Sequence, residues 1–343
     1  MDIKKRKLDF HNTIIELLHT ARQKVVRSVN QTMTYTYYEI GKRIVEEEQK
    51  GEERADYGKQ LLSSLSKTLG QEFGRGFSIR NLEQMRKFYL VYTIPQTLSA
   101  ELKTTKRQYS KFNISWSHYT FLIRIEDSNE RKFYEIESEK NNWSIRELKR
   151  QHNSALYNRL KLGRNTKEIK SLSKKGLSIQ NPKDLIKDPY ILEFIGLPEH
   201  SSYSENELES TIINKLELFL LELGNGFTFV ARQKRFSFDD KHFYIDLVFY
   251  NRILNCMVLI DLKIGELKHQ DIGQMQMYVN YYDRKLTLEH ENKTIGLILS
   301  QHKNDAVVQY TLPENNDQIF ASKHKTILPS KKELKKLLTT KTT

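Results

Sequence analysis

Apolar residues in the first 160 positions recur at intervals of three and four, which is the period of an amphipathic helix. The pattern predicts helices over residues 12–29, 55–73 and 79–92. Gly74-Arg75-Gly76 interrupts it, and Ser78, which follows, is a favourable N-cap residue for the third of these helices. The N-terminal part of the chain is therefore expected to be helical.

From residue 205 onward the hydrophobic pattern changes. A helix with a broad apolar face is predicted over 205–223 and ends at Gly224-Asn225-Gly226. Segments rich in β-branched and aromatic residues then predict strands, interrupted by one helix over 271–282. This order of elements is typical of a small mixed sheet with helices on its faces, so we expect an α/β domain. The strands are predicted at 227–238, 243–250, 256–262, 295–299 and around 307–312.

Charge is distributed unevenly along the 343 residues, whose net charge is +13. Residues 1–200 carry 37 Lys and Arg against 25 Asp and Glu, whereas residues 201–300 carry 11 against 14. A basic half beside an acidic one suits a protein that holds a polyanion with one part and collects divalent cations with the other. The alternative, that the chain is simply rich in lysine, stays open.

The apolar period fades after about residue 160, where basic side chains dominate. We therefore expect a basic helical N-terminal domain over 1–165, a basic linker over 166–190 and the α/β domain over 191–343. The single cysteine, Cys256, excludes an intramolecular disulfide, and no apolar run reaches the length of a spanning helix. We expect a soluble, cytoplasmic protein that does not enter a membrane.

Two aspartates interrupt strands that are otherwise apolar, Asp246 and Asp261. A buried carboxylate requires a cation, a hydrogen-bond partner or the open end of a sheet. Asp261 and Lys263 are two residues apart on a strand, so their side chains point to one face, about 7 Å apart along the backbone. They could form a buried ion pair, or they could join Asp246 in holding Mg²⁺ or Mn²⁺ for phosphodiester cleavage. The residues alone leave both interpretations open.

The helices on either side of these strands offer further polar side chains. Gln274 and Tyr278 are four residues apart and share a helix face, so an amide and a phenol can meet the same pocket. Glu205 and Glu209 share a face of the preceding helix in the same way. Either glutamate could supply a third carboxylate.

Together these residues resemble the PD-(D/E)XK nuclease superfamily, in the branch similar to RecB-type nucleases. The resemblance rests on Asp246, on Asp261-Leu262-Lys263 fifteen residues later, and on the glutamates and Gln-x-x-x-Tyr of the neighbouring helices. Ile245 stands where the superfamily's nominal pattern has proline. Longer strings, spread over about residues 12–312, are similar to the bacterial YhcG family: 38–44, 55–58, 73–78, 81–86, 229–235, 244–250, 258–263 and 273–275.

The resemblance implies a restriction-endonuclease-like core and a nuclease that depends on a divalent metal, Mg²⁺ or Mn²⁺. Of the two helical glutamates we prefer Glu209, because it follows Leu208 and lies nearer the apolar face, although the helical phase permits Glu205. Carried over to this sequence, the metal ligands are Asp246, Asp261 and Glu209, the catalytic lysine is Lys263, and the helix motif is Gln274 with Tyr278.

Basic residues in both domains are candidates for contact with nucleic acid. We expect DNA as substrate and partner and, by analogy with the family, a role in DNA repair, recombination or defence against foreign DNA. A homodimer and a protein partner of the N-terminal domain are further expectations. The alternatives are a non-catalytic nucleic-acid-binding or scaffold protein with the nuclease fold, or a nuclease acting on RNA. The candidate contacts are Arg80, Arg86 and Lys87 on the third helix, and Arg232, Lys234 and Arg235 on the first strand, where a solvated face is equally expected.

Overall fold

The computed structural model describes residues 3–50, 55–93, 112–161, 164, 166–197, 203–238 and 241–328. The chain divides into two compact units, Met1–Lys149 and Arg150–Thr343. This division falls inside helix α7 (Ile145–Asn153). No helix among the described residues combines the length and the apolar character needed to cross a membrane.

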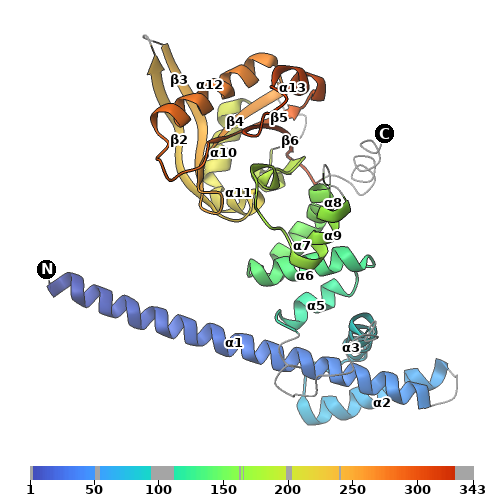
Figure 1. The fold of residues 1–343 in the computed structure, drawn as a ribbon. Helices are drawn as coiled ribbons and strands as arrows, with labels where there is room; N and C mark the ends of the chain where they lie inside the picture. The colour runs from blue at the N-terminus through green and yellow to red at the C-terminus, as the bar shows by residue number, and fades with distance from the viewer. Residues whose placement is uncertain are drawn as a thin grey trace. The chain divides into compact units, whose positions relative to one another are not determined.

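The first unit is helical where it is described, as the sequence predicts. The predicted helix over 12–29 is part of the much longer α1, and those over 55–73 and 79–92 are α2 and α3 (Figure 1). Ser78 caps α3, because its side chain accepts a hydrogen bond from the Asn81 backbone N–H. Gly41 lets α1 and α3 approach closely, since a Cβ there would lie 2.0 Å from the Met85 carbonyl oxygen. The helices are α1 (Ile3–Lys50), α2 (Ala55–Phe73), α3 (Ile79–Tyr92), α5 (Trp116–Leu122) and α6 (Ser128–Lys140), followed by the start of α7.

The second unit is built on a six-stranded mixed sheet with strand order β1-β6-β5-β4-β3-β2. Strands β2, β3 and β4 pair antiparallel, and β4, β5, β6 and β1 pair parallel. The parallel step from β4 to β5 needs a crossover, which α12 supplies. The strands are β1 (Tyr190–Ile191), β2 (Phe227–Phe238), β3 (Lys241–Asn251), β4 (Cys256–Glu266), β5 (Ile295–His302) and β6 (Ile319–Lys325).

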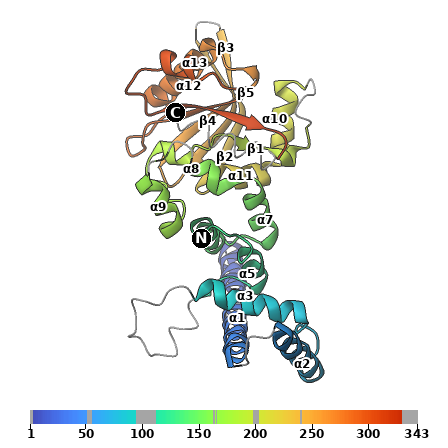
Figure 2. The ribbon, with the colours of Figure 1, turned by 90° about the vertical axis from the view of Figure 1, so that its right-hand side faces the viewer.

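Helices cover both faces of this sheet, and two apolar cores fill the space between (Figures 1 and 2). One core joins α10 and α11 to β3, β4 and β5, and the other joins α12 to the opposite face. Burial on both faces explains the nearly continuous apolar sequence of β4 and β5. The helices are α8 (Leu156–Lys161), α9 (Thr166–Lys175), α10 (Glu205–Asn214), α11 (Leu216–Leu223), α12 (His269–Lys285) and α13 (Asp305–Thr311), with 3-10 turns at Pro182–Leu185 and Glu193–Ile195.

The β2–β3 hairpin extends beyond the rest of the sheet. It is paired from Phe227 and Asn251 to Phe238 and Lys241, whereas β3 pairs with β4 only over the last five residues of β3, beginning at Leu247. Strands β3 and β4 therefore part immediately before Leu247. This opening positions the candidate site.

Several elements differ from the sequence predictions. The helix predicted over 205–223 is two helices, because the chain leaves helical geometry at Lys215 (φ −123°, ψ 33°). The strand predicted around 307–312 is wrong: this segment is helix α13, which begins there because the Asn304 side chain accepts hydrogen bonds from the backbone N–H groups of Ala306 and Val307. The last sheet strand is instead β6. The segment predicted as a linker, 166–190, contains α9 and a 3-10 turn.

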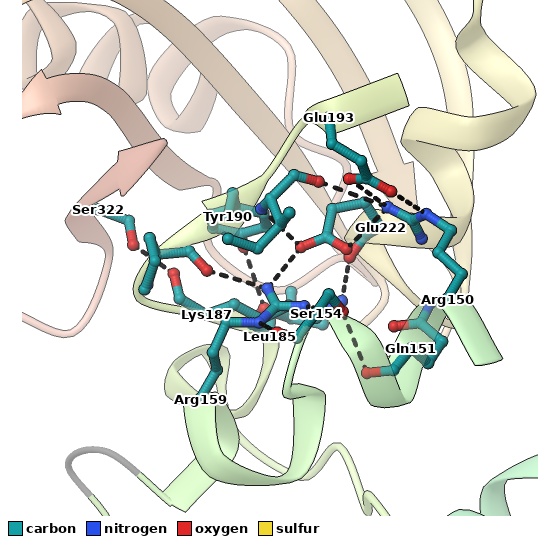
Figure 3. A network of polar contacts seen from close by, with 12 residues as sticks. Arg150, Gln151, Ser154, Arg159, Leu185, Lys187, Tyr190, Glu193, Glu222 and Ser322 are labelled. Carbon is teal, nitrogen blue, oxygen red and sulfur yellow. Dashed lines mark hydrogen bonds and ion pairs between the residues drawn. The ribbon is translucent and has the colours of Figure 1, made fainter. Parts of the chain in front are cut away.

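Within the second unit, a buried network of polar side chains joins α8 and the end of α7 to β1 and α11 (Figure 3). Arg159 Nη1 lies 2.6 Å from Glu222 Oε1, and these side chains are 1% and 0% exposed. Arg150 bridges Glu222 and Glu193, with Nη2–Oε2 and Nε–Oε1 distances of 3.4 and 2.7 Å. Lys187 Nζ donates to the Glu222 backbone carbonyl. The half-buried Arg150 and the buried Arg159 are thus both paired with carboxylates of this unit.

Charge in this network is more than balanced, because three cations surround two carboxylates. Burial by itself would raise the pKa of Glu222, but Arg159, Lys187 and Arg150 lower it to about 2. The carboxylate also accepts a hydrogen bond from the Ile191 backbone N–H at 3.0 Å. Glu222 is therefore a fully paired structural anion.

Candidate active site

Asp246 lies at the point where β3 and β4 part. The last paired residues of the two strands are Leu247 and Ile260, so Asp246 is the next residue on β3 and Asp261 the next on β4. Asp246 Oδ2 accepts a hydrogen bond from the Leu262 backbone N–H at 2.7 Å. The Asp246 carboxylate serves as the acceptor for this N–H in place of a backbone carbonyl. The hydrogen bond also places the two aspartates side by side.

Asp261 is 2% exposed, and its Oδ2 lies 2.9 Å from Lys263 Nζ. Burial and the adjacent Asp246 carboxylate raise the pKa of Asp261 to about 7, in spite of the lysine. Burial alone would lower the pKa of Lys263, but Asp261 and Glu205 raise it above its ordinary value. Lys263 is therefore a persistent cation, and the carboxylate pair keeps an excess of negative charge.

Both helical glutamates reach this site, at different points. Glu209, 6% exposed on α10, accepts a hydrogen bond from Gln233 Nε2 at 2.5 Å. The same amide nitrogen lies 3.1 Å from Asp246 Oδ1 and donates to it as well. Glu205 instead accepts from the Ile264 backbone N–H at 3.2 Å and lies 3.7 Å from Lys263 Nζ. Burial and the Asp246 charge raise the pKa of Glu209.

Gln233 is the site residue that sequence reasoning missed. It faces Asp246 across the hairpin, because its neighbours Arg232 and Lys234 pair with Leu247 and Ile245. Its backbone has φ 45°, a left-handed conformation that is uncommon for glutamine. A glutamine in a strand carries no sequence signal for such a backbone, and the one signal at this position is that it lies within the string 229–235 that resembles the YhcG family. Unusual backbone geometry of this kind is frequent at functional sites.

The predicted helix motif lies behind the aspartates. Gln274 Nε2 donates a hydrogen bond to the Tyr278 hydroxyl oxygen, and the Tyr278 O–H donates to the Tyr244 carbonyl at 2.9 Å. Tyr278 is buried, and burial raises its pKa. The motif therefore fixes α12 to β3 two residues before Asp246.

Of the predicted nucleic-acid contacts, Arg232 lies nearest the carboxylates. It is exposed on β2, pairs with Leu247 next to Asp246, and its charge partly offsets the rise in the pKa of Glu209. Lys234 and Arg235 are exposed on the extended part of the hairpin. In the first unit, Arg80 and Lys87 are exposed on α3, whereas Arg86 Nε lies 2.5 Å from Glu48 Oε2. Arg86 is thus already paired with a carboxylate.

Among the described residues, no group of three or more His, Cys, Asp or Glu side chains lies close enough together to hold a metal ion. The donor set is a pair of carboxylates, with Glu209 held next to Asp246 through Gln233. Mg²⁺ is commonly bound by one or two carboxylates, with waters and substrate phosphates as the other ligands. The pair and its uncompensated charge fit such an ion.

This chain is similar to known protein families along most of its length. The model of the YhcG PDDEXK nuclease domain matches residues 183–339, and that of the DUF1016 N-terminal domain matches residues 13–159. The chain is 40% identical over 344 residues to "Putative nuclease YhcG" of Escherichia coli (strain K12), which covers 94% of this chain and 91% of that protein.

Two solved structures are also similar over part of the chain. A repair endonuclease from Pyrococcus abyssi matches with a TM-score of 0.25 and 16% identity, over 39% of this chain and 50% of that one. EndoMS in its apo form matches with a TM-score of 0.23 and 15% identity, over 38% of this chain and 49% of that one. The chain thus spans about half of each solved chain.

Proposed function

Because this chain belongs to the YhcG family, whose C-terminal domain is a PDDEXK nuclease domain, we propose that it hydrolyses phosphodiester bonds in DNA with Mg²⁺ or Mn²⁺. The observation that carries the proposal is the position of Asp246, Asp261 and Lys263 where β3 and β4 part. By family analogy the setting is DNA repair, recombination or defence against foreign DNA.

Each residue of the site has a separate task. Asp246 and Asp261 hold the divalent ion, which when bound lowers the pKa of a water and neutralises charge at phosphorus. Lys263, whose Nζ lies 2.9 Å from Asp261 Oδ2, stabilises the negative charge that develops on the phosphate. Gln274 and Tyr278 hold β3 in place through the Tyr244 carbonyl.

Gln233 is a positioning residue in this proposal. Its amide nitrogen donates to both Glu209 and Asp246, so one neutral side chain holds two carboxylates together before a cation binds. Gln233 contacts only one carboxylate oxygen of Glu209, so Glu209 can act as a further ligand through the other. We assign Gln233 the role of holding the Glu209 and Asp246 carboxylates next to each other without adding charge.

The test is cleavage of labelled single-stranded, duplex and branched DNA, and of RNA, by the full chain with Mg²⁺ or Mn²⁺. Asp261→Ala and Lys263→Ala should each lower the rate by about 100-fold or more. Asp317→Ala and Lys293→Ala, which remove the same groups from exposed positions, should leave it unchanged. Cleavage that survives both site substitutions would overturn the proposal. Preference for RNA would change the substrate and leave the site assignment intact.

A further inference from the structure

The helical unit contains a groove that neither the family resemblance nor the predicted contacts point to. It has a volume of about 720 Å³ and lies between the middle of α1 and two later segments, 113–118 at the start of α5 and 138–143 at the end of α6. All of its lining residues belong to the first unit.

Polar contacts between its walls hold the groove in shape. Gln31 Nε2 on α1 donates to Asn113 Oδ1 at 2.7 Å, and Arg27 Nη2 lies 3.3 Å from Glu139 Oε1 on α6. The His118 ring nitrogens lie 2.6 Å from Ser115 Oγ and 2.9 Å from the Trp143 carbonyl oxygen. The two later segments are thereby joined to each other as well as to α1.

The lining of the groove is rich in cations and poor in carboxylates. The cations are Arg22, Lys24 and Arg27, which all come from α1 and have exposed side chains. The one acidic lining residue, Glu139, pairs with Arg27. Among the described residues, Arg22 and Lys24 form no ion pair, so their charges remain available to an anion from outside.

The remaining polar lining consists of asparagine amides, from Asn30, Asn113 and Asn142, and hydroxyl groups. Arginine, lysine, asparagine and serine side chains are the usual hydrogen-bond donors to phosphate and sugar oxygens in nucleic-acid complexes. An open groove between helices, with exposed cations along one wall, fits a row of phosphates better than a single small anion. An acidic protein surface would use the charges but leave the amides without a specific partner.

We propose that this groove binds the phosphate backbone of a nucleic-acid strand and is the main nucleic-acid contact of the helical unit. The proposal rests on the proposed function, because it assumes that the chain acts on nucleic acid. It gives α1 the role that the sequence assigns to α3, where Arg86 is already paired with Glu48.

The experiment measures the affinity of the full chain for a labelled strand by fluorescence anisotropy in EDTA, over a series of NaCl concentrations. The variant Arg22→Gln/Lys24→Gln should bind about tenfold more weakly, and the slope of log K against log[NaCl] should become shallower by about 1 to 2. The matched control is Lys59→Gln/Lys67→Gln on α2, which removes two exposed charges elsewhere in the unit and should leave the slope unchanged.

Three results would overturn the proposal. The first is equal weakening by the groove pair and the control pair, which would indicate a diffuse charge effect. The second is an unchanged strand affinity in the groove variant together with a large loss of affinity in Arg80→Ala/Arg86→Ala/Lys87→Ala. That result would identify α3 as the main contact. The third is that Arg22→Gln/Lys24→Gln loses binding to polyglutamate, used as a model of an acidic protein, but keeps its affinity for the strand. That result would identify a protein-binding groove. Since binding is read in EDTA, a chain that binds but never cleaves would contradict the proposed function and leave the groove standing.

Discussion

Glu222 and Asp261 are buried carboxylates of the same unit, with side chains 0% and 2% exposed, and their pKa values move in opposite directions. Burial acts on both in the same way. Three cations lower the pKa of Glu222 to about 2, whereas a second carboxylate and one lysine leave that of Asp261 at about 7. The two pKa values differ because the balance of charge around each carboxylate differs, and not because one carboxylate is more deeply buried.

This contrast separates a structural acid from one suited to chemistry. At Glu222 the protein supplies every partner, so the network has no need of a ligand. At Asp261 and Asp246 the protein supplies less positive charge than the carboxylates require, which leaves room for an added cation. Incomplete compensation, at a position where two strands part, is the feature that distinguishes the candidate active site.

The largest expected effect is at the balanced site. Arg159→Met removes the closest cation from Glu222 and leaves a carboxylate that is only partly paired, so the free energy of unfolding should fall by about 3–5 kcal/mol. Urea denaturation of the full chain at pH 7 measures it. Arg252→Met, at an exposed position, is the control and should change stability by no more than about 0.5 kcal/mol. If Arg159→Met lowers the free energy of unfolding by less than about 1 kcal/mol, Arg150 and Lys187 alone are enough to stabilise the Glu222 carboxylate.

The dependence of stability on pH should have opposite signs at the two acids. The lowered pKa of Glu222 gives stability that is present above its unfolded value of about 4.5 and is lost as the pH falls toward 2. The raised pKa of Asp261 makes the cation-free protein lose stability as the pH rises from about 4 to 7, because the folded state holds the proton more tightly. Each effect is on the order of 1 kcal/mol per unit of pKa shift.

Denaturation midpoints measured between pH 2 and pH 8 in EDTA would resolve these two slopes. Glu222→Gln should remove the acid-side slope, and Asp261→Asn should remove the slope between pH 4 and 7. If Asp261→Asn leaves the second slope in place, the proton that titrates near pH 7 belongs to another group.

The smallest expected effect concerns Gln233. Gln233→Met keeps the length of the side chain but removes the donor shared by Glu209 and Asp246, so stability should fall by about 1 kcal/mol. In a Glu209→Gln background the same change should cost less, since one of the two acceptors has lost its charge. A double-mutant cycle read by denaturation, together with the Mn²⁺ affinity of each variant, measures this. Additive effects on both quantities would exclude the bridge.

Much of the fold follows from hydrophobic period, because periods of three to four and of two are imposed by burial itself. The bounds of α2 and α3 and the four strands between residues 227 and 299 follow in this way, apart from small shifts at the strand ends. A short apolar segment can fit both the helical period and the strand period, so its secondary structure is ambiguous. Residues 305–311 are an example, since the Asn304 cap decides for helix although Val307 and Val308 favour a strand.

The candidate site is only partly predictable for a related reason. Asp246, Asp261 and Lys263 are visible because charges interrupt apolar strands. Gln233 and the cations Arg150 and Arg159 are not, because a polar residue on a strand or helix looks the same whether it faces solvent or a buried carboxylate. The partners are brought together only by tertiary contacts across dozens of residues.

Binding of Mn²⁺ to the full chain, measured by isothermal titration calorimetry at pH 8, tests the central claim most directly. We predict that the wild type binds the ion, that Asp246→Asn and Asp261→Asn each weaken binding by about tenfold or more, and that Asp317→Asn does not. Equal affinity in the wild type and in both site variants would contradict the assignment of Asp246 and Asp261 as the cation ligands.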